Sequence, residues 1–125
     1  MTLFKSRSPA QTRKLAQSMA RDAEKWSGRR PFVLALEGGL GSGKTTFAQG
    51  FADALGINEK VLSPTFVLLK VYKLPAGKNF RHLIHIDCYR LDLPKDLLHL
   101  GFKNFLKDKD AILLIEWADR IRKIL

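Results

Sequence analysis

The sequence contains the run Gly38-Gly39-Leu40-Gly41-Ser42-Gly43-Lys44-Thr45 directly after a short apolar segment. This run fits the pattern G-x-x-x-x-G-K-[ST] at every fixed position. Glycines let the backbone wrap around a phosphate with its N–H groups pointing inward. We therefore expect Lys44 to reach the β- and γ-phosphates of a nucleoside triphosphate, and the hydroxyl of Thr45 to hold a magnesium ion.

The segments on either side supply the context that such a loop requires. Residues 32–36 form an apolar run that is typical of a buried strand. After the loop, apolar residues recur at helical spacing as far as Leu55, and Gly56 is a natural C-terminal stop. The order of strand, glycine-rich loop and helix predicts an α/β fold whose helix directs its positive end at the phosphates. A glycine-rich turn without a ligand is the alternative that this context disfavours.

The overall charge is strongly positive and points to anionic ligands. The chain has 22 Lys and Arg against 12 Asp and Glu, and residues 1–30 hold eight basic and two acidic side chains. This excess favours nucleotides, nucleic acid or an acidic protein partner, while a solvated basic surface is an equally simple explanation. The single cysteine, Cys88, allows no disulfide within the chain, and no segment resembles a signal peptide or a membrane span. We expect a cytoplasmic protein without membrane contact.

Periodicity outlines the remaining elements. Ser8 and Pro9 are typical of a helix start, and apolar spacing predicts a helix that ends at Gly28. Two further runs are strand-like and are joined by a turn, which predicts an antiparallel hairpin. Pro94 opens a helical region, and a strongly apolar run before Glu116 predicts a central strand. The hairpin strands span residues 66–72 and 82–87, and the central strand spans residues 111–115.

Two of these predicted strands end in an acid. Asp87 and Glu116 each follow an apolar run, and ligands in open α/β sheets lie at the carboxyl ends of parallel strands. Glu116 is expected to hold magnesium, directly or through water, or to orient the attacking water. Thr65 is a candidate γ-phosphate sensor, although an ordinary strand start is the simpler reading of a threonine after proline. His85 lacks the further ligands of a metal site, so packing or a hydrogen bond is expected there.

Several motifs in order resemble the TsaE (YjeE) family of P-loop ATPases, which serve the synthesis of threonylcarbamoyladenosine in tRNA. The resemblance covers almost the whole chain, and the H-x-D-x-Y-R-L run and the Glu-Trp pair are its most specific parts. The motifs are Gly41-Ser42-Gly43-Lys44-Thr45-Thr46-Phe47, Ser63-Pro64-Thr65-Phe66, His85-Ile86-Asp87-Cys88-Tyr89-Arg90-Leu91 and Ile115-Glu116-Trp117.

The resemblance implies ATP and Mg²⁺ as cofactors and a role for each matching residue. Thr45 and Glu116 would hold magnesium, Asp87 would be needed for hydrolysis, and Thr65 would act as the switch-type hydroxyl near the γ-phosphate. Lys44 would act in catalysis as well as in binding. The implied nucleotide-binding residues are Thr12, which would approach the adenine, and Gly39, Leu40, Gly41, Ser42, Gly43, Lys44, Thr45 and Thr46. The partners would be TsaB and TsaD, with tRNA reached through that complex, and ATP hydrolysis would reset the complex between cycles.

The chain departs from the family pattern at two places. Gly39 stands where the family usually has Asp, and we expect nucleotide binding to survive because that acid is not a fixed P-loop position. The family also continues past Glu-Trp with one or two strands, whereas this chain ends nine residues after Glu116. The resemblance therefore implies one P-loop ATPase domain over residues 1–125, with a three-layer α/β fold, a mixed sheet and the family's C-terminal strands absent. A truncated piece, a natural short form and a broken gene all remain open.

Two other functions fit parts of the sequence. A small-molecule P-loop kinase would use the same loop, but no lid-like insertion with an arginine is obvious. A nucleotide-sensing RNA-binding module would explain the net charge of +10. A GTPase is disfavoured because no N-K-x-D motif is present.

Overall fold

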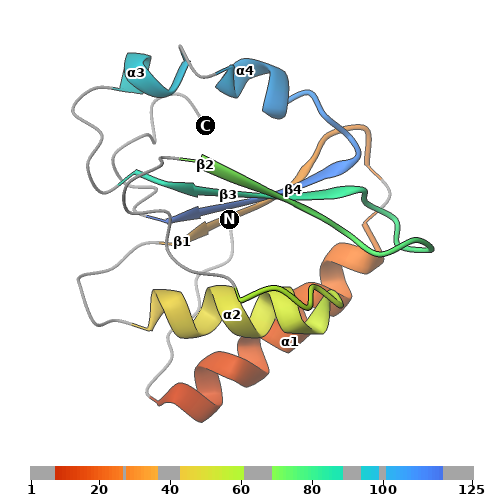
Figure 1. Cartoon of the computed structure of the whole chain (residues 1–125), viewed down its shortest axis with the longest axis vertical. Helices are drawn as coiled ribbons and strands as arrows, with labels where there is room; N and C mark the ends of the chain where they lie inside the picture. The colour runs from red at the N-terminus through yellow and green to blue at the C-terminus, as the bar shows by residue number, and fades with distance from the viewer. Residues whose placement is uncertain are drawn as a thin grey trace.

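The computed structural model describes residues 8–26, 28–36, 43–60, 69–88, 94–98 and 101–116. In chain order, the elements are α1 (Pro9–Glu24), β1 (Phe32–Leu36), α2 (Lys44–Ala54), β2 (Leu69–Lys73), β3 (His82–Asp87), α3 (Pro94–Leu98), α4 (Phe102–Phe105) and β4 (Ala111–Glu116). α1 and α2 cover one face of the sheet, and α3 and α4 cover the other (Figure 1). This arrangement confirms the predicted three-layer α/β fold.

The described strands form one mixed sheet in the order β1-β4-β3-β2. β4 lies between β1 and β3 and pairs with both in parallel, while β2 and β3 pair antiparallel. The predicted hairpin and the predicted central strand are therefore confirmed. All six residues of β4 are buried, as expected for a parallel strand that is covered on both faces. Residues 66–68 of the predicted hairpin and the tail after Glu116 lie outside the described ranges.

The first helix starts as predicted but ends earlier. The hydroxyl of Ser8 accepts a hydrogen bond from the backbone N–H of Gln11 at 3.1 Å, which is a side-chain N-cap. The helix ends at Glu24, whereas the sequence predicted an end at Gly28. The difference arises because the chain already turns at Trp26, whose indole N–H donates to the carbonyl of Arg30 at 2.9 Å.

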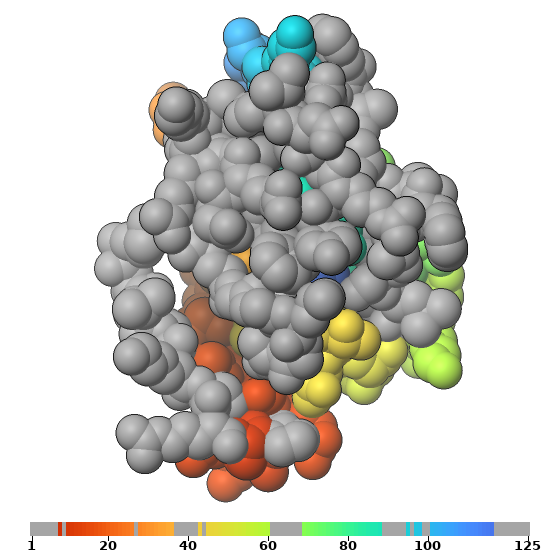
Figure 2. Space-filling view, turned by 90° about the vertical axis from the view of Figure 1, so that its left-hand side faces the viewer, coloured from red at the N-terminus to blue at the C-terminus, as the bar shows by residue number. Residues whose placement is uncertain are grey.

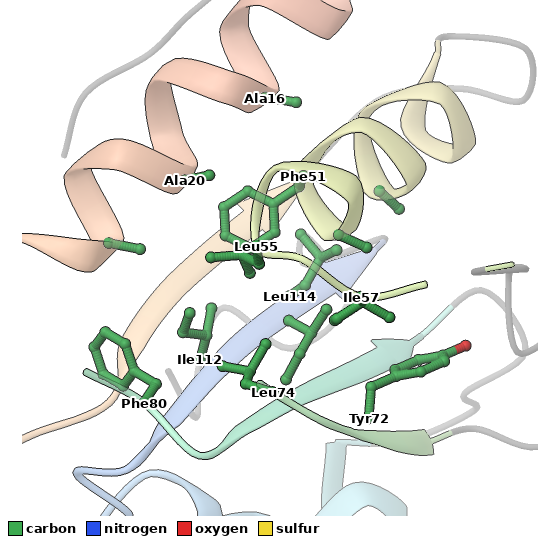
Figure 3. Close-up of a cluster of buried hydrophobic side chains, with 14 of the residues drawn as sticks. Ala16, Ala20, Phe51, Leu55, Ile57, Tyr72, Leu74, Phe80, Ile112 and Leu114 are labelled. Atoms are coloured by element: carbon green, nitrogen blue, oxygen red, sulfur yellow. The ribbon is translucent and has the colours of Figure 1, made fainter. Parts of the chain in front are cut away.

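Small residues let the two helices on one face approach closely. Ala16, Ala20 and Ala23 of α1 are at most 2% exposed and belong to the cluster that contains Phe51 of α2 (Figure 3). A methyl group added at Gly50 would lie 3.3 Å from the Cβ of Ala16, so the contact leaves little room for a larger side chain. The position of α1 over the sheet therefore depends on small residues at this contact.

The opposite face has a second apolar cluster beneath two short helices. The sequence predicted one helical region after Pro94, but the structure has two separate helices, with Gly101 at φ 88° as the N-cap of α4. A positive φ is accessible to glycine at little cost, which explains the break. The cluster consists of Ile84, Ile86, Cys88, Leu97, Phe102, Ala111, Leu113 and Ile115. Among the described helices, none is long and apolar enough to cross a membrane.

We predict that Gly50→Leu destabilises the protein by about 1–3 kcal/mol, because the new side chain must enter the contact with Ala16. The measurement is the free energy of unfolding in urea. Ala54→Leu is the matched control, since Ala54 is exposed on the same helix and its replacement should change stability by about 0.5 kcal/mol or less. Equal stabilities of the two variants would contradict the close packing of α1 on α2.

Candidate nucleotide-binding site

The strand register brings two acids together at one end of the sheet. Asp87 of β3 is the partner of Glu116 of β4, and Glu116 is in turn the partner of Leu36 of β1. The final residues of three parallel strands therefore form one row. The chain returns from Leu36 to Gly43, immediately before α2, within six residues. This short connection limits how far Gly43 and the start of α2 can lie from the row of strand ends.

Both acids are on the face of the sheet that α1 and α2 cover. Leu36, Leu83 and Leu114 contribute to the cluster on that face, and side chains alternate along a strand, so Asp87 and Glu116 project the same way. Asp87 is 7% exposed and Glu116 is 2% exposed. Two carboxylates that are buried side by side repel one another when ionised, so they require cationic or hydrogen-bonding partners.

His85 is one such partner. Its Nε2 lies 2.6 Å from Oε2 of Glu116, and the two side chains are 0% and 3% exposed. His85 is two residues before Asp87 on β3, so it shares the same face of the sheet. The sequence predicted either packing or a hydrogen bond for His85, and the structure shows a hydrogen bond to the acid that is expected to hold magnesium. Nδ1 of His85 is buried and has no hydrogen-bond partner among the described residues.

The start of α2 has the backbone that a phosphate loop requires. Gly43 has φ 90°, a left-handed conformation that favours glycine, and it is the N-cap of the helix. The first hydrogen bond of α2 runs from the N–H of Phe47 to the carbonyl of Gly43. The preceding N–H groups, those of Lys44, Thr45 and Thr46, therefore lie at the positive end of an 11-residue helix. Figure 2 views this end of the molecule, with α2 in yellow and α1 in red.

Thr12 lies beside that same glycine. A Cβ added at Gly43 would be 3.5 Å from Oγ1 of Thr12, which places the first helix against the start of α2. Thr12 is 7% exposed, and its hydroxyl donates to the carbonyl of Ser8 at 3.0 Å. Sequence reasoning assigned Thr12 to the site through the family resemblance alone. The structure brings Thr12 to the glycine of the loop, and its contact with adenine stays a prediction.

The remaining predicted site residues are only partly described. Gly39, Leu40, Gly41, Ser42 and Thr65 lie outside the described residues, and for Lys44 only the backbone is described. Thr45 is exposed at the start of α2, and Thr46 is half-buried. The described part of the site therefore consists of the start of α2, the neighbouring Thr12 and the two acids with His85.

The described donors fit a magnesium ion. Mg²⁺ prefers oxygen ligands and usually keeps several waters, with one or two carboxylates and the phosphates of a nucleotide completing its shell. Glu116 could supply a carboxylate, which is hydrogen-bonded to His85, and Thr45 could supply a hydroxyl at the start of α2. Within the described ranges, no group of three or more His, Cys, Asp or Glu side chains could hold a metal by itself. Such a magnesium site would therefore need the phosphates of the nucleotide.

The strand ladder continues one residue beyond the acids. The backbone N–H of Cys88 donates to the carbonyl of Glu116 at 3.0 Å, and the thiol of Cys88 is fully buried on the opposite face of the sheet. This bond holds the chain on both sides of Asp87. The position of Cys88 in the second apolar cluster indicates a structural role for this residue.

The comparison with protein families agrees with the motifs. The family model described as "Threonylcarbamoyl adenosine biosynthesis protein TsaE" matches residues 6–125. The tRNA threonylcarbamoyladenosine biosynthesis protein TsaE of Bacillus subtilis is 41% identical over 91 residues, which are 73% of this chain and 53% of that protein. The protein of the same name from Haemophilus influenzae is 36% identical over 96 residues, which are 77% of this chain and 58% of that protein. The chain thus spans a little over half the length of these relatives.

A solved structure has a similar fold. The crystal structure of YdiB from Bacillus subtilis superposes with a TM-score of 0.68 at 32% sequence identity. The match covers 98% of this chain and 68% of YdiB. The described sheet and helices are therefore arranged as in an experimentally determined protein.

We predict that His85 and Glu116 are energetically coupled. His85→Leu and Glu116→Leu should each lower the free energy of unfolding, since each leaves a buried polar group with one hydrogen bond fewer. The double variant should cost less than the sum of the single variants, with a coupling of about 1–3 kcal/mol. Urea unfolding of all four proteins measures this coupling. His82→Leu on the same strand, combined with Glu116→Leu, is the matched control and should be additive.

Proposed function

The chain belongs to the TsaE family, and we propose that it binds and hydrolyses ATP with Mg²⁺ during tRNA threonylcarbamoyladenosine biosynthesis. One observation carries this proposal: Asp87 and Glu116 are paired in register at the end of the sheet, next to the strand that leads into the phosphate loop. A phosphate loop alone fits many functions. A phosphate-loop sequence that follows a strand in register with two buried acids, one of them hydrogen-bonded to a histidine, supports hydrolysis of the nucleotide.

The phosphate loop would bind the triphosphate through its backbone. In this proposal the N–H groups at the start of α2 face the phosphates, and Lys44 reaches the β- and γ-phosphates. Thr45 and Glu116 hold the magnesium ion, which when bound neutralises charge on the phosphate oxygens. The hydrogen bond from His85 favours one orientation of the Glu116 carboxylate, so this ligand would be preorganised before the nucleotide arrives.

Asp87 would act on the attacking water. It is the in-register neighbour of Glu116, so it lies at the same end of the sheet but on a different strand from the proposed metal ligand. A carboxylate in this position can accept a hydrogen bond from the water and orient it toward the γ-phosphate. Thr65 is proposed as the hydroxyl near the γ-phosphate. Gly39, Leu40, Gly41, Ser42 and Thr46 complete the proposed loop contacts, and Thr12 is proposed to approach the adenine.

The proposed partners are TsaB and TsaD. Isolated P-loop ATPases are often slow because they lack a group that stabilises the transition state and that a neighbouring protein supplies. We propose that this chain docks on the TsaB–TsaD pair and that hydrolysis resets the complex between cycles. Transfer RNA would then bind to the assembled complex.

We predict that Asp87→Asn and Glu116→Gln retain ATP binding and lose hydrolysis by about 100-fold or more, because each removes a charged oxygen without changing the side-chain volume. Binding is measured by calorimetry, and hydrolysis by phosphate release under saturating Mg·ATP. Asp53→Asn is the control, since Asp53 is exposed and accepts a hydrogen bond from Gln49 far from the strand ends. An unchanged rate in either acid variant would exclude that acid from the reaction.

We also predict that the full chain restores multiple-turnover tRNA modification to a mixture of TsaB and TsaD. Lys44→Ala should abolish this activity, because the variant has lost the cation of the phosphate loop. Lys14→Ala is the control, since Lys14 is exposed on α1. Modified tRNA per TsaD molecule is the measured quantity. If the unmodified chain does not raise this ratio above one modified tRNA per TsaD molecule, the proposed role in turnover is refuted.

A further inference from the structure

A basic hollow lies between two distant segments of the chain. It has a volume of about 430 Å³ and is lined by Arg29, Arg30, Lys103, Leu106 and Lys107. Four of these five side chains are cationic, none is acidic, and all four cations are exposed. The residues come from the segment before β1 and from α4 with the turn that follows it. We call this feature the basic hollow.

The basic hollow is at the opposite end of the sheet from the proposed nucleotide site. β1 and β4 are parallel, so the segments that precede them meet at one edge, while Leu36 and Glu116 finish at the other. Figure 1 shows the segment before β1 (orange) and the segment before β4 (blue) together on the right, away from the start of α2. The phosphates that are proposed to bind at Lys44 and its loop therefore cannot account for the positive charge of the basic hollow.

The four cations have no carboxylate partner within the described part of the chain. The ion pairs found there join Lys78 with Glu24 and His85 with Glu116. Like charges that are gathered around one cavity repel one another, and this repulsion is relieved when an anion binds between them. Arginine also presents a planar fork of donors that matches a phosphate group. The cationic ends of these side chains are thus suited to phosphate, while their aliphatic stems and Leu106 make most of the lining itself apolar.

The turn that carries the two arginines is fixed by Trp26. The indole N–H donates to the carbonyl of Arg30, and the ring lies so close to Gly28 that an added Cβ would be 2.6 Å from Cζ2. The ring also meets Phe32 edge to face, with 6.0 Å between the centroids. Even so, Trp26 remains 43% exposed. Trp26 does not line the basic hollow, but it belongs to the same turn as Arg29 and Arg30. RNA-binding proteins often combine an exposed aromatic ring, which stacks on a base, with nearby cations that hold the backbone.

We propose that the basic hollow binds the phosphodiester backbone of RNA and that Trp26 stacks on a neighbouring base. The exposed aromatic ring favours RNA over an acidic protein segment or a free polyphosphate, since neither of those offers a base. The choice of tRNA as the RNA rests on the proposed function. The nucleotide site and the RNA site would then occupy opposite ends of the same sheet.

The test is the affinity of the full chain for labelled tRNA, measured by fluorescence anisotropy at several salt concentrations. Arg30→Gln/Lys103→Gln removes two cations from the basic hollow, and Lys14→Gln/Lys73→Gln removes two exposed cations elsewhere. We expect the first variant to bind about tenfold more weakly and to lower the slope of log affinity against log salt by about two. The control should keep both values close to those of the unmodified chain.

A third variant tests the stacking step. Trp26→Leu should weaken tRNA binding by about tenfold with an unchanged salt slope, because stacking releases no counterions. A smaller slope of log affinity against log salt in this variant would show that Trp26 acts only by fixing the turn that carries Arg29 and Arg30. That result would overturn the stacking part of the proposal.

Three outcomes would overturn assignment of the basic hollow to RNA. The first is equal tRNA affinity of the two double variants. The second is displacement of tRNA by inorganic tripolyphosphate at equal phosphate concentration, which would identify free polyphosphate as the ligand. The third is binding of polyglutamate, but not tRNA, in a manner that depends on Arg30 and Lys103, which would identify an acidic protein partner. ATP hydrolysis is measured on the same variants, and its retention would show that a failure concerns the basic hollow and leaves the proposed function intact.

Discussion

The structure depends on the insertion of β4 between β1 and β3. Parallel pairing on both sides of β4 sets Leu36, Glu116 and Asp87 in one row, although these residues are far apart in the sequence. Without this pairing, the two acids would not lie together, and they would not share a row with Leu36, the last described residue before the phosphate-loop sequence. The pairing in turn depends on an unbroken apolar run in β4, because both of its faces are covered.

This pairing also creates a local electrostatic conflict. Two acids that are adjacent and almost fully buried are unfavourable by themselves. His85 relieves part of this conflict at Glu116. The arrangement is typical of sites at which local stability is given up for binding, since a cation is attracted where carboxylates are crowded together. A buried pair of this kind is difficult to explain by packing alone.

Much of the fold was predictable from residue patterns, because helix caps, apolar periodicity and turn residues act locally. The hairpin, the central strand and the start of α2 at the loop were predicted in this way and are confirmed. The strand order was not predictable from local patterns, because the position of β4 between β1 and β3 results from pairing across long stretches of chain. The end of α1 was predicted a few residues too late, since the chain leaves the helix at Lys25 and the indole of Trp26 bonds to the carbonyl of Arg30 in the turn that follows.

The two acids of the candidate site could be proposed from the sequence, because each comes directly after an apolar run. The hydrogen-bond partner of His85 could not be predicted in this way. His85 and Asp87 are two residues apart on one strand, so their side chains lie on the same face of the sheet. This spacing was the one indication in the sequence that His85 belongs near the acids. Identifying Glu116 as the partner requires the register of β3 on β4, which no local pattern contains. Thr12 was assigned to the site from the family resemblance alone, because its proximity to Gly43 depends on how α1 crosses α2.

The burial of Cys88 has a practical consequence. Its thiol is fully enclosed, and its amide is hydrogen-bonded to the same residue that is proposed to hold magnesium. A thiol-reactive reagent can reach this sulfur only when the cluster beneath α3 and α4, or the end of the β3–β4 ladder, opens locally. The rate of alkylation would therefore report local opening on this face of the sheet, so the single cysteine provides a native kinetic probe without any introduced label.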